Sequence, residues 1–190
     1  MASGQTPSQT VGPFFHYGLT PDQSGYAFSG LVPSRLDDPA VSGDRIQISG
    51  RVLDGMGEPV SDALIEFWQA DASGRYAHPA DTRGANTPFR GFARVPTDKD
   101  GRWKFHTIKP AAIGDGQAPH ITVILFSRGS QNHLYTRIYF SDEAPANDRD
   151  GVLASVPADR RSTLIAQKTA SGYTFDIRMQ GGEETVFFDV

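Results

Sequence analysis

The sequence predicts an all-β fold, an antiparallel β-sandwich with an extended N-terminal arm and one short helix. About seven short segments alternate apolar and polar residues between turn signals, which is the pattern of strands that bury one face. The 20 glycines and 13 prolines suit many turns better than a bundle of long helices. Because 190 residues can bury one sizeable core, a single domain over residues 1–190 is the simpler organisation.

Residues 1–44 are the predicted arm. They mix proline and glycine with aromatic residues and show no sustained hydrophobic period, so neither a helix nor a long strand is predicted there. The aromatic content is too high for a free tail, since the segment holds Phe14, Phe15, Tyr17, Tyr26 and Phe28. We therefore predict that this arm packs on a partner and that residues 45–190 form the sandwich.

The strands follow in order along residues 45–190. Residues 45–54 alternate, and a turn at Asp54 to Gly57 leads into a second strand within residues 61–71. Further strands are expected over 101–108, 120–128, 134–142, 172–180 and 184–190, and the one short helix over 158–168. The longest irregular stretch covers residues 71–99, and a loop of that length in a compact domain is usually functional.

Composition excludes several classes of function. The chain has no cysteine, so disulfides, zinc-thiolate sites and thiol catalysis are excluded, and any metal must be held by His, Tyr, Asp or Glu. The net charge of -4, with both signs well mixed, argues against nucleic acid or an anionic membrane as the partner. The opening residues lack the basic start and apolar run of a signal peptide, so a cytoplasmic location is expected.

A dense motif runs from Ile48 to Tyr76. It comprises the spaced residues Ile48, Gly50, Val52, Gly57, Val60, Leu64, Glu66 and Phe67, then "WQADAS", then "GRY". This pattern resembles the signature of the intradiol ring-cleavage dioxygenases, iron(III) enzymes that split catechols between their two hydroxyl groups. The match extends over about thirty residues and includes many fixed positions, so it is more specific than a short motif.

The resemblance implies an iron site and shows where this chain departs from it. Family members bind Fe(III) through two tyrosines and two histidines, because hard phenolate donors favour ferric iron, which can then draw electron density from a bound catecholate. Tyr76 and His120 match the first tyrosine and the first histidine. Ile113 and Thr122 stand where the second of each belongs, and neither is a plausible ligand. We therefore expect no metal in this chain.

The rest of the chain resembles one subunit of a heteromeric branch of this family. Segments such as "TPSQTVGPFFHYGL" and "YTFDIRMQGGEETVFFDV" resemble the iron-free alpha subunit, over nearly the whole length. The resemblance implies a homologous beta subunit that binds Fe(III) and carries the catalytic residues, in pairs that assemble further. It also implies the reaction of 3,4-dihydroxybenzoate with O2 to give 3-carboxy-cis,cis-muconate, in the beta-ketoadipate route of aromatic catabolism.

The same resemblance assigns substrate-binding residues to this chain but no catalytic ones. Thr10, Gly12, Pro13 and Phe14 match residues of the arm near the substrate pocket, and Arg128 matches an arginine facing the substrate carboxylate. A guanidinium is always charged, which suits a carboxylate partner. An apolar wall from the arm would position the flat ring.

Alternatives remain open at this level. Tyr76 and His120 are more commonly packing residues than ligands, and Arg128 and Arg137 could be members of structural ion pairs. Two other functions fit the fold: a homomeric intradiol enzyme with a different ligand set, which iron bound to the isolated chain would support, and a non-catalytic binding module such as an aromatic-acid carrier, which would need no partner.

Overall fold

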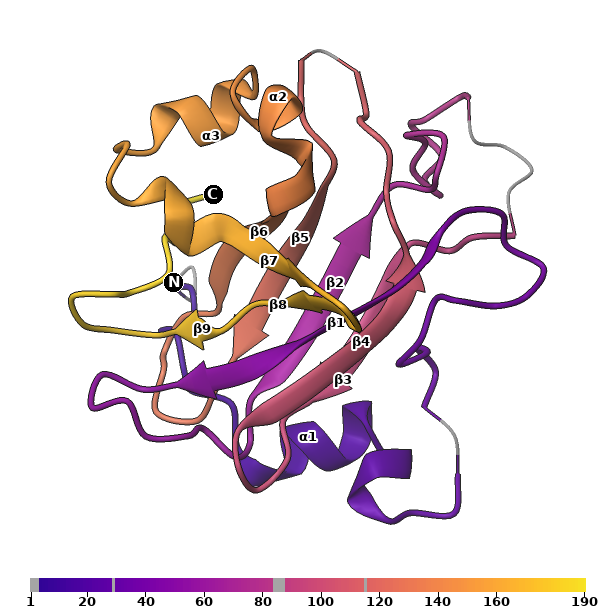
Figure 1. The fold of residues 1–190 in the computed structure, drawn as a ribbon. Coiled ribbons are helices and arrows are strands. Elements are labelled where there is room, and N and C mark those ends of the chain that lie inside the picture. Colours follow the sequence, from indigo (N-terminus) through magenta and orange to yellow (C-terminus); the bar gives the residue numbers. More distant parts are fainter. Residues whose placement is uncertain (1–3, 29, 84–87, 115) are drawn as a thin grey trace.

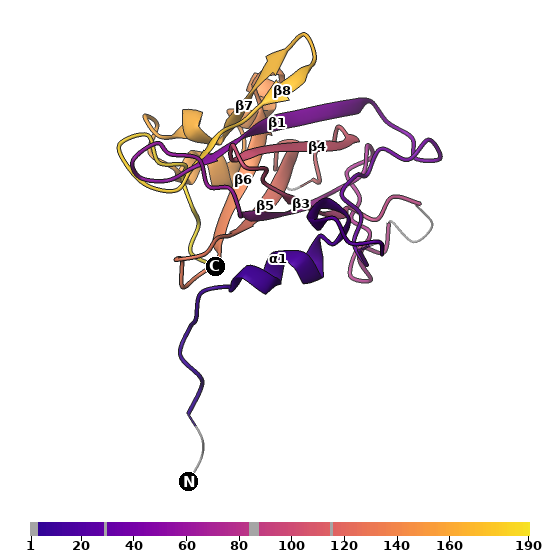
Figure 2. The same cartoon turned by 90° about the horizontal axis from the view of Figure 1, so that it is seen from below.

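The structure is a computed structural model that describes residues 4–28, 30–83, 88–114 and 116–190. Within these residues nine strands form a continuous hydrogen-bonded path in the order β3-β2-β5-β6-β7-β8-β1-β4, with β9 paired to β1 (Figure 1). The path folds over into two layers, with β1 and β8 on one side and β5 and β3 on the other (Figure 2). This confirms the predicted β-sandwich. The strands are β1 Arg45–Leu53, β2 Leu64–Gln69, β3 Phe92–Pro96, β4 Arg102–Ile108, β5 His120–Phe126, β6 Leu134–Phe140, β7 Ile165–Thr169, β8 Gly172–Thr174 and β9 Ile177–Arg178.

The hydrophobic core lies between the two layers. Phe67 of β2 is fully buried, and its ring stacks on that of Phe105 of β4 with centroids 4.2 Å apart. Alternate residues of the neighbouring strand β5, Ile121, Val123 and Leu125, face the same core. Burial of each such side chain stabilises the fold by about 1.5–3 kcal/mol. The core thereby fixes the outer face of β2, β5 and β6, which carries the candidate site.

Three strand pairs are parallel, although the sequence predicted an antiparallel sandwich. They are β6 with β7, β1 with β8 and β1 with β9. Parallel neighbours need a crossover connection, and the chain supplies one between β6 and β7. This crossover contains the 3-10 helices η2 Ser141–Glu143 and η3 Arg161–Leu164 and the helices α2 Ala144–Asn147 and α3 Gly151–Ser155.

The prediction of a helix over residues 158–168 is wrong. The segment forms the short turn η3 and then strand β7. Ile165 of β7 pairs with Tyr139 of β6, while the guanidinium of Arg161 donates to the carbonyls of Val156 and Ala154. Sheet pairing and these bonds outweigh the helical propensity of the segment. Among the described residues no helix has both the length and the apolar character needed to cross a membrane.

Three further predictions about strands need correction. The expected strand over 172–180 is broken into β8 and β9, and residues 184–190 make only an isolated bridge between Phe188 and Tyr135. Strand β3 was missed because it lies inside the 71–99 stretch, where a Gly- and Pro-rich context masks its short alternation. It pairs with β2, and its Arg94 forms an ion pair with Glu66 across the two strands.

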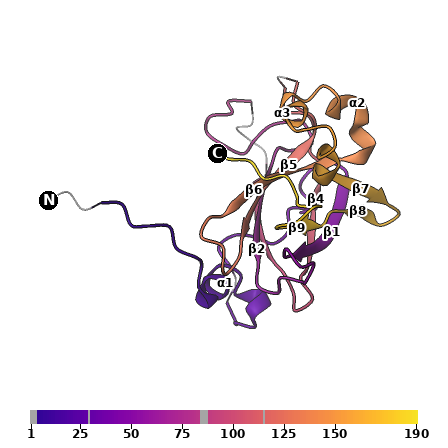
Figure 3. The same ribbon diagram turned by 90° about the vertical axis from the view of Figure 1, so that its left-hand side faces the viewer.

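The arm contains a helix that the sequence did not predict. Helix α1, Pro13–Leu19, begins with a proline at its first position, where the missing N–H costs nothing, and is followed by the 3-10 helix η1 Asp22–Ser24. The ring of Phe15 packs on that of Phe126 of β5, with centroids 5.3 Å apart. The residues before α1 extend away from the body of the molecule (Figures 2 and 3). The arm therefore contacts its own sheet through α1, and packing on a partner stays a prediction.

Candidate functional site

The "WQADASGRY" motif folds into a tight loop around Asp71, which follows β2. The carboxylate of Asp71 accepts hydrogen bonds from the backbone N–H groups of Ser73 and Arg75 at 2.8 and 3.0 Å. It also accepts two bonds from the Arg75 guanidinium, at 2.9 and 3.1 Å. Gly74 closes the loop in the left-handed region, with φ of 72°. These bonds fix the backbone of the loop and thereby the position of Tyr76.

Tyr76 and Ile113 border the same cavity. The Tyr76 ring stacks on Trp68 of β2 with centroids 5.5 Å apart and an interplanar angle of 11°. Both rings and the Ile113 side chain line a cavity of about 630 Å³. Burial raises the pKa of Tyr76, and the positive charge of Arg137 opposes this shift. The phenol is therefore protonated at neutral pH.

His120 and Thr122 lie on the same face of β5. His120 is 3% exposed, and its Nδ1–H donates to the carbonyl of Ala118 at 2.8 Å, which leaves the lone pair on Nε2. Burial lowers the pKa of His120 to about 4, and the guanidinium of Arg137 adds to the shift, so the imidazole is neutral at pH 7. Thr122 stands directly opposite Arg137 of β6 in the strand register.

These four positions do not fit a ferric ion. Tyr76 and His120 offer one phenol oxygen and one imidazole nitrogen, whereas Ile113 has no lone pair and Thr122 has a neutral hydroxyl. Across the described part of the chain, no group of three or more His, Cys, Asp or Glu side chains could hold a metal ion. The donor set of this chain is therefore too small for the family's iron.

The arm and Arg128 meet at a second place in the fold. The N–H of Gly129 donates to the Thr10 hydroxyl at 2.8 Å, which fixes the part of the arm just before α1 beside Arg128. The Arg128 guanidinium pairs with Asp62, from the turn before β2. Gly12 and these two charged residues line a small cavity of about 210 Å³. The structure thus brings Thr10, Gly12 and Arg128 together, although 118 positions separate the first from the last in the numbering of the chain.

The other two predicted residues of the arm lie beside this corner at the start of α1. The side chain of Pro13 lies outside what the structure describes. Phe14 is 80% exposed and begins a row of aromatic rings with centroids 5.6 to 6.1 Å apart. We call this row the aromatic ladder, and it consists of Phe14, Tyr17, Tyr26 and Phe28, all of them exposed. Four exposed aromatic rings in contact are unusual on a free surface.

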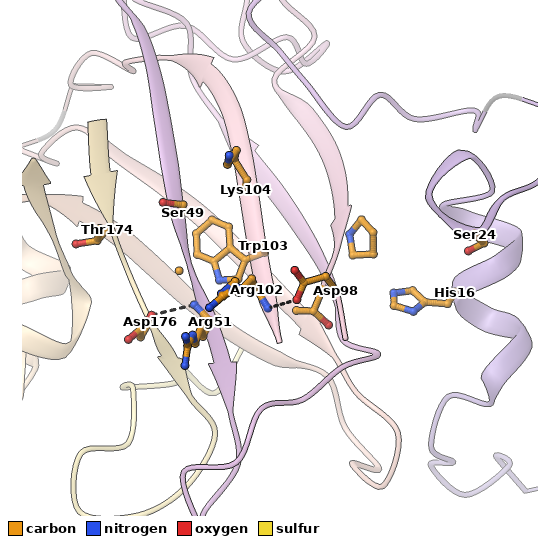
Figure 4. Close-up of a pocket in the computed structure, with 13 residues that line it drawn as sticks. His16, Ser24, Ser49, Arg51, Asp98, Arg102, Trp103, Lys104, Thr174 and Asp176 are labelled. Carbon is orange, nitrogen blue, oxygen red and sulfur yellow. Dashed lines mark hydrogen bonds between the residues drawn. The ribbon is translucent and has the colours of Figure 1, made fainter. Parts of the chain in front are cut away.

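Another cavity, of about 770 Å³, contains none of the predicted site residues. It lies between α1 and the outer face of β1 and β4, where Figure 4 shows His16 across from the end of β4. Its charged residues are of both signs, and the carboxylates of Asp98 and Asp176 accept backbone N–H bonds from Arg102 and Arg51. Three basic and two acidic residues line it, so its charge is nearly balanced and does not indicate a ligand.

Sequence reasoning missed Asp62 and Asp150, which shape these places, and assigned the wrong kind of partner to Arg137. Arg137 was expected to form an ion pair with a carboxylate, but its guanidinium donates instead to neutral oxygens of Gln117 and Tyr139, at 3.0 and 3.4 Å. Asp62 lies 66 positions before its partner Arg128, so no local pattern could reveal the pair. Asp150 is fully buried, which no motif indicates.

Comparison with known proteins decides the family. A dioxygenase family model matches residues 20–181. The alpha chain of protocatechuate 3,4-dioxygenase from Burkholderia cepacia is 48% identical over 193 residues, and the match covers 98% of both chains. The chain belongs to the intradiol dioxygenase family. This membership confirms the resemblance that the 48–76 signature indicated.

Two further comparisons bear on the sequence and on the fold. The beta chain of protocatechuate 3,4-dioxygenase from Burkholderia cepacia is 38% identical over 159 residues, which covers 75% of this chain and 67% of that one. Among solved structures, the dioxygenase domain of a carbohydrate-binding fusion protein from Streptomyces sp. SirexAA-E has a TM-score of 0.61 at 24% identity, over 93% of this chain and all of that one. The fold of that domain is therefore shared although its sequence has diverged.

Proposed function

We propose that this chain is the alpha subunit of a protocatechuate 3,4-dioxygenase, which converts 3,4-dihydroxybenzoate and O2 to 3-carboxy-cis,cis-muconate. The observation that carries the proposal is the match over 98% of both chains to an alpha chain, at 48% identity. The donor set supports it, because Ile113 and Thr122 leave this chain unable to hold the iron that the reaction needs. The ferric ion, held by a beta subunit, would supply the activation of the catechol.

The beta chain is the partner that the proposal requires. A beta chain of this enzyme is 38% identical to this chain, so the two subunits have a common ancestor and can pair about a pseudo-twofold axis. Such an interface uses the equivalent face of both subunits. We expect this face to be the outer surface of β2, β5 and β6, which carries Thr122 and Arg137.

This chain would contribute the corner of Thr10, Gly12 and Arg128 to the partner's active site. The Arg128 side chain is 55% exposed, so its guanidinium can reach a carboxylate outside its own chain. The hydrogen bond between Gly129 and Thr10 holds the arm against this corner. Phe14 begins the aromatic ladder next to it, and aromatic residues of this kind are enriched in the buried centres of interfaces. We expect the ladder to be buried by the partner.

The first test is the iron content and colour of the chain alone and in complex. Tyrosinate bound to ferric iron absorbs visible light, so colour reports the family's metal site directly. We expect the chain to be colourless when purified alone, and its complex with a protocatechuate 3,4-dioxygenase beta chain to be coloured, with about one iron per pair. A chain that binds ferric iron and cleaves catechols alone would instead be a homomeric enzyme. A stable chain that binds no beta chain would be a carrier or another binding module.

Arg128→Gln is expected to weaken the use of protocatechuate by the complex selectively. Losing one charge-assisted contact to a carboxylate costs roughly 1.5–3 kcal/mol, which corresponds to an increase in KM of about 10- to 100-fold. Catechol has no carboxylate, so its kcat/KM should not change. Glutamine avoids placing a second negative charge beside Asp62, and the exposed Arg128–Asp62 pair contributes little to stability.

Steady-state kinetics with both substrates make this comparison. Arg51→Gln is the matched control, since Arg51 is also exposed but lies on β1 in the other layer. Equal losses for protocatechuate and catechol, or no loss for either, would remove Arg128 from the substrate site.

A further inference from the structure

Arg137 lies among the positions where the family binds its metal. It sits on β6, half-buried, and directly faces Thr122 across the strand pair. Its Nη1 donates to Gln117 Oε1 at 3.0 Å and to Tyr139 Oη at 3.4 Å. His120 stands opposite Tyr139 in the same register. The guanidinium is therefore held beside the β5 positions of both former histidine ligands.

The charge of Arg137 is not neutralised by a carboxylate in direct contact. Among the ion pairs of the described residues, none includes Arg137. The nearest acidic link is indirect: the Tyr139 hydroxyl, which accepts from Arg137, donates in turn to Asp150 Oδ1 at 3.1 Å. The positive charge therefore acts on its neighbours: it opposes the rise that burial causes in the pKa of Tyr76, and it adds to the lowering that burial causes in the pKa of His120.

A fixed cation at this place works against a metal ion in two ways. It repels a second positive charge, and the repulsion is strong because the site is partly shielded from water. It also occupies the neutral oxygens of Gln117 and Tyr139, which hold it in place. Ferric iron, with three positive charges, would suffer this repulsion more than any divalent ion.

We propose that the Arg137 guanidinium supplies the positive charge of this partly buried cluster in place of a metal and thereby excludes iron from it. The missing ligands at Ile113 and Thr122 are then only part of the reason why this chain holds no iron. The inference concerns this chain by itself and does not depend on the proposed function. In this proposal Arg137 is a permanent positive charge that takes the place of the metal ion.

The test restores the ligands with and without Arg137. The full-length chain carries Ile113→Tyr and Thr122→His, alone or combined with Arg137→Gln or Arg137→Lys, and is titrated with ferric iron. We expect the Arg137→Gln variant to bind iron and to show the visible tyrosinate absorption. Its affinity for iron should be at least about tenfold higher than that of the variants with Arg137 or Arg137→Lys, since both of these keep the charge. Arg128→Gln in the same background is the matched control and should have no effect.

Each result bears on the proposal. Equal iron affinity with arginine and glutamine at position 137 would overturn it. Absence of iron binding in every variant would overturn it as well, because ligand geometry alone would then account for the exclusion. Circular dichroism shows that each variant is folded, and the single Thr122→His background, which leaves Ile113 unchanged, gives the same comparison if the double substitution unfolds the chain.

Discussion

Asp150→Ala is expected to lower the free energy of unfolding by about 3–5 kcal/mol, because it removes a buried carboxylate that satisfies three donors. Asp150 is 0% exposed. Its two oxygens accept the N–H of Ala118 and the N–H of Leu153, each at 2.8 Å, and the hydroxyl of Tyr139 at 3.1 Å. Alanine would leave these donors buried without partners. Since Ala118 also accepts the hydrogen bond from His120, the damage should extend to the start of β5.

Urea unfolding followed by circular dichroism measures this effect. Asp98→Ala is the matched control, since the Asp98 carboxylate likewise accepts two backbone N–H groups, at 2.9 Å, but is exposed to water. Water can replace those bonds, so a loss of about 1 kcal/mol is expected for Asp98→Ala. If the two variants lose the same free energy of unfolding, the burial of Asp150 does not increase the cost of losing its hydrogen bonds, and the expectation is wrong.

The strands that bury one face were predictable, because alternation is imposed by the core itself. Ile46, Ile48 and Val52 mark β1, and the row Ile121, Val123 and Leu125 marks β5. The failures lie where long-range pairing decides the local structure. Ile165 joins β7 because Tyr139 of β6 is beside it, and the sequence around Ile165 alone indicates a helix.

The candidate site also has features that the sequence could predict and features that depend on long-range contacts. The motif matched Tyr76 and Ile113 to two ligand positions of the family, and in the fold both residues line one cavity, with the turn around Asp71 setting the position of Tyr76. The pair of Arg128 with Asp62 could not be predicted, since it joins two loops that only the folded sheet brings together. The charge of Arg137 was visible in the sequence, but its neutral partners were not. The chemical groups of the site could therefore be read from the residues, whereas the contacts between distant residues depend on the topology of the folded sheet.

Gly74→Ala is expected to destabilise the signature loop by roughly 3 kcal/mol or more, because two separate costs add at one position. The backbone of Gly74 has φ of 72°, a conformation that a side chain disfavours by about 1–2 kcal/mol. A Cβ at this position would also lie well inside the van der Waals contact distance to the Ala112 carbonyl oxygen. Relief of this clash must separate the loop from residue 112, which lies next to Ile113 in the wall of the cavity. Tyr76, two residues after the glycine, would then lose its stacking on Trp68.

Gly57→Ala separates the two costs. Gly57 has a comparable φ of 81°, but a Cβ there would meet no atom within 4 Å, so only the backbone cost of about 1–2 kcal/mol should appear. Urea unfolding gives the stability of both variants. Tryptophan fluorescence and near-ultraviolet circular dichroism report the loop, because Trp68 stacks on Tyr76 whereas the only other tryptophan, Trp103, lies in the core. Gly74→Ala should alter the Trp68 signal in the folded protein while Gly57→Ala does not. Equal stability losses and unchanged spectra would show that the loop yields to the Cβ without moving Tyr76, and that the close approach of Ala112 does not hold the loop in place.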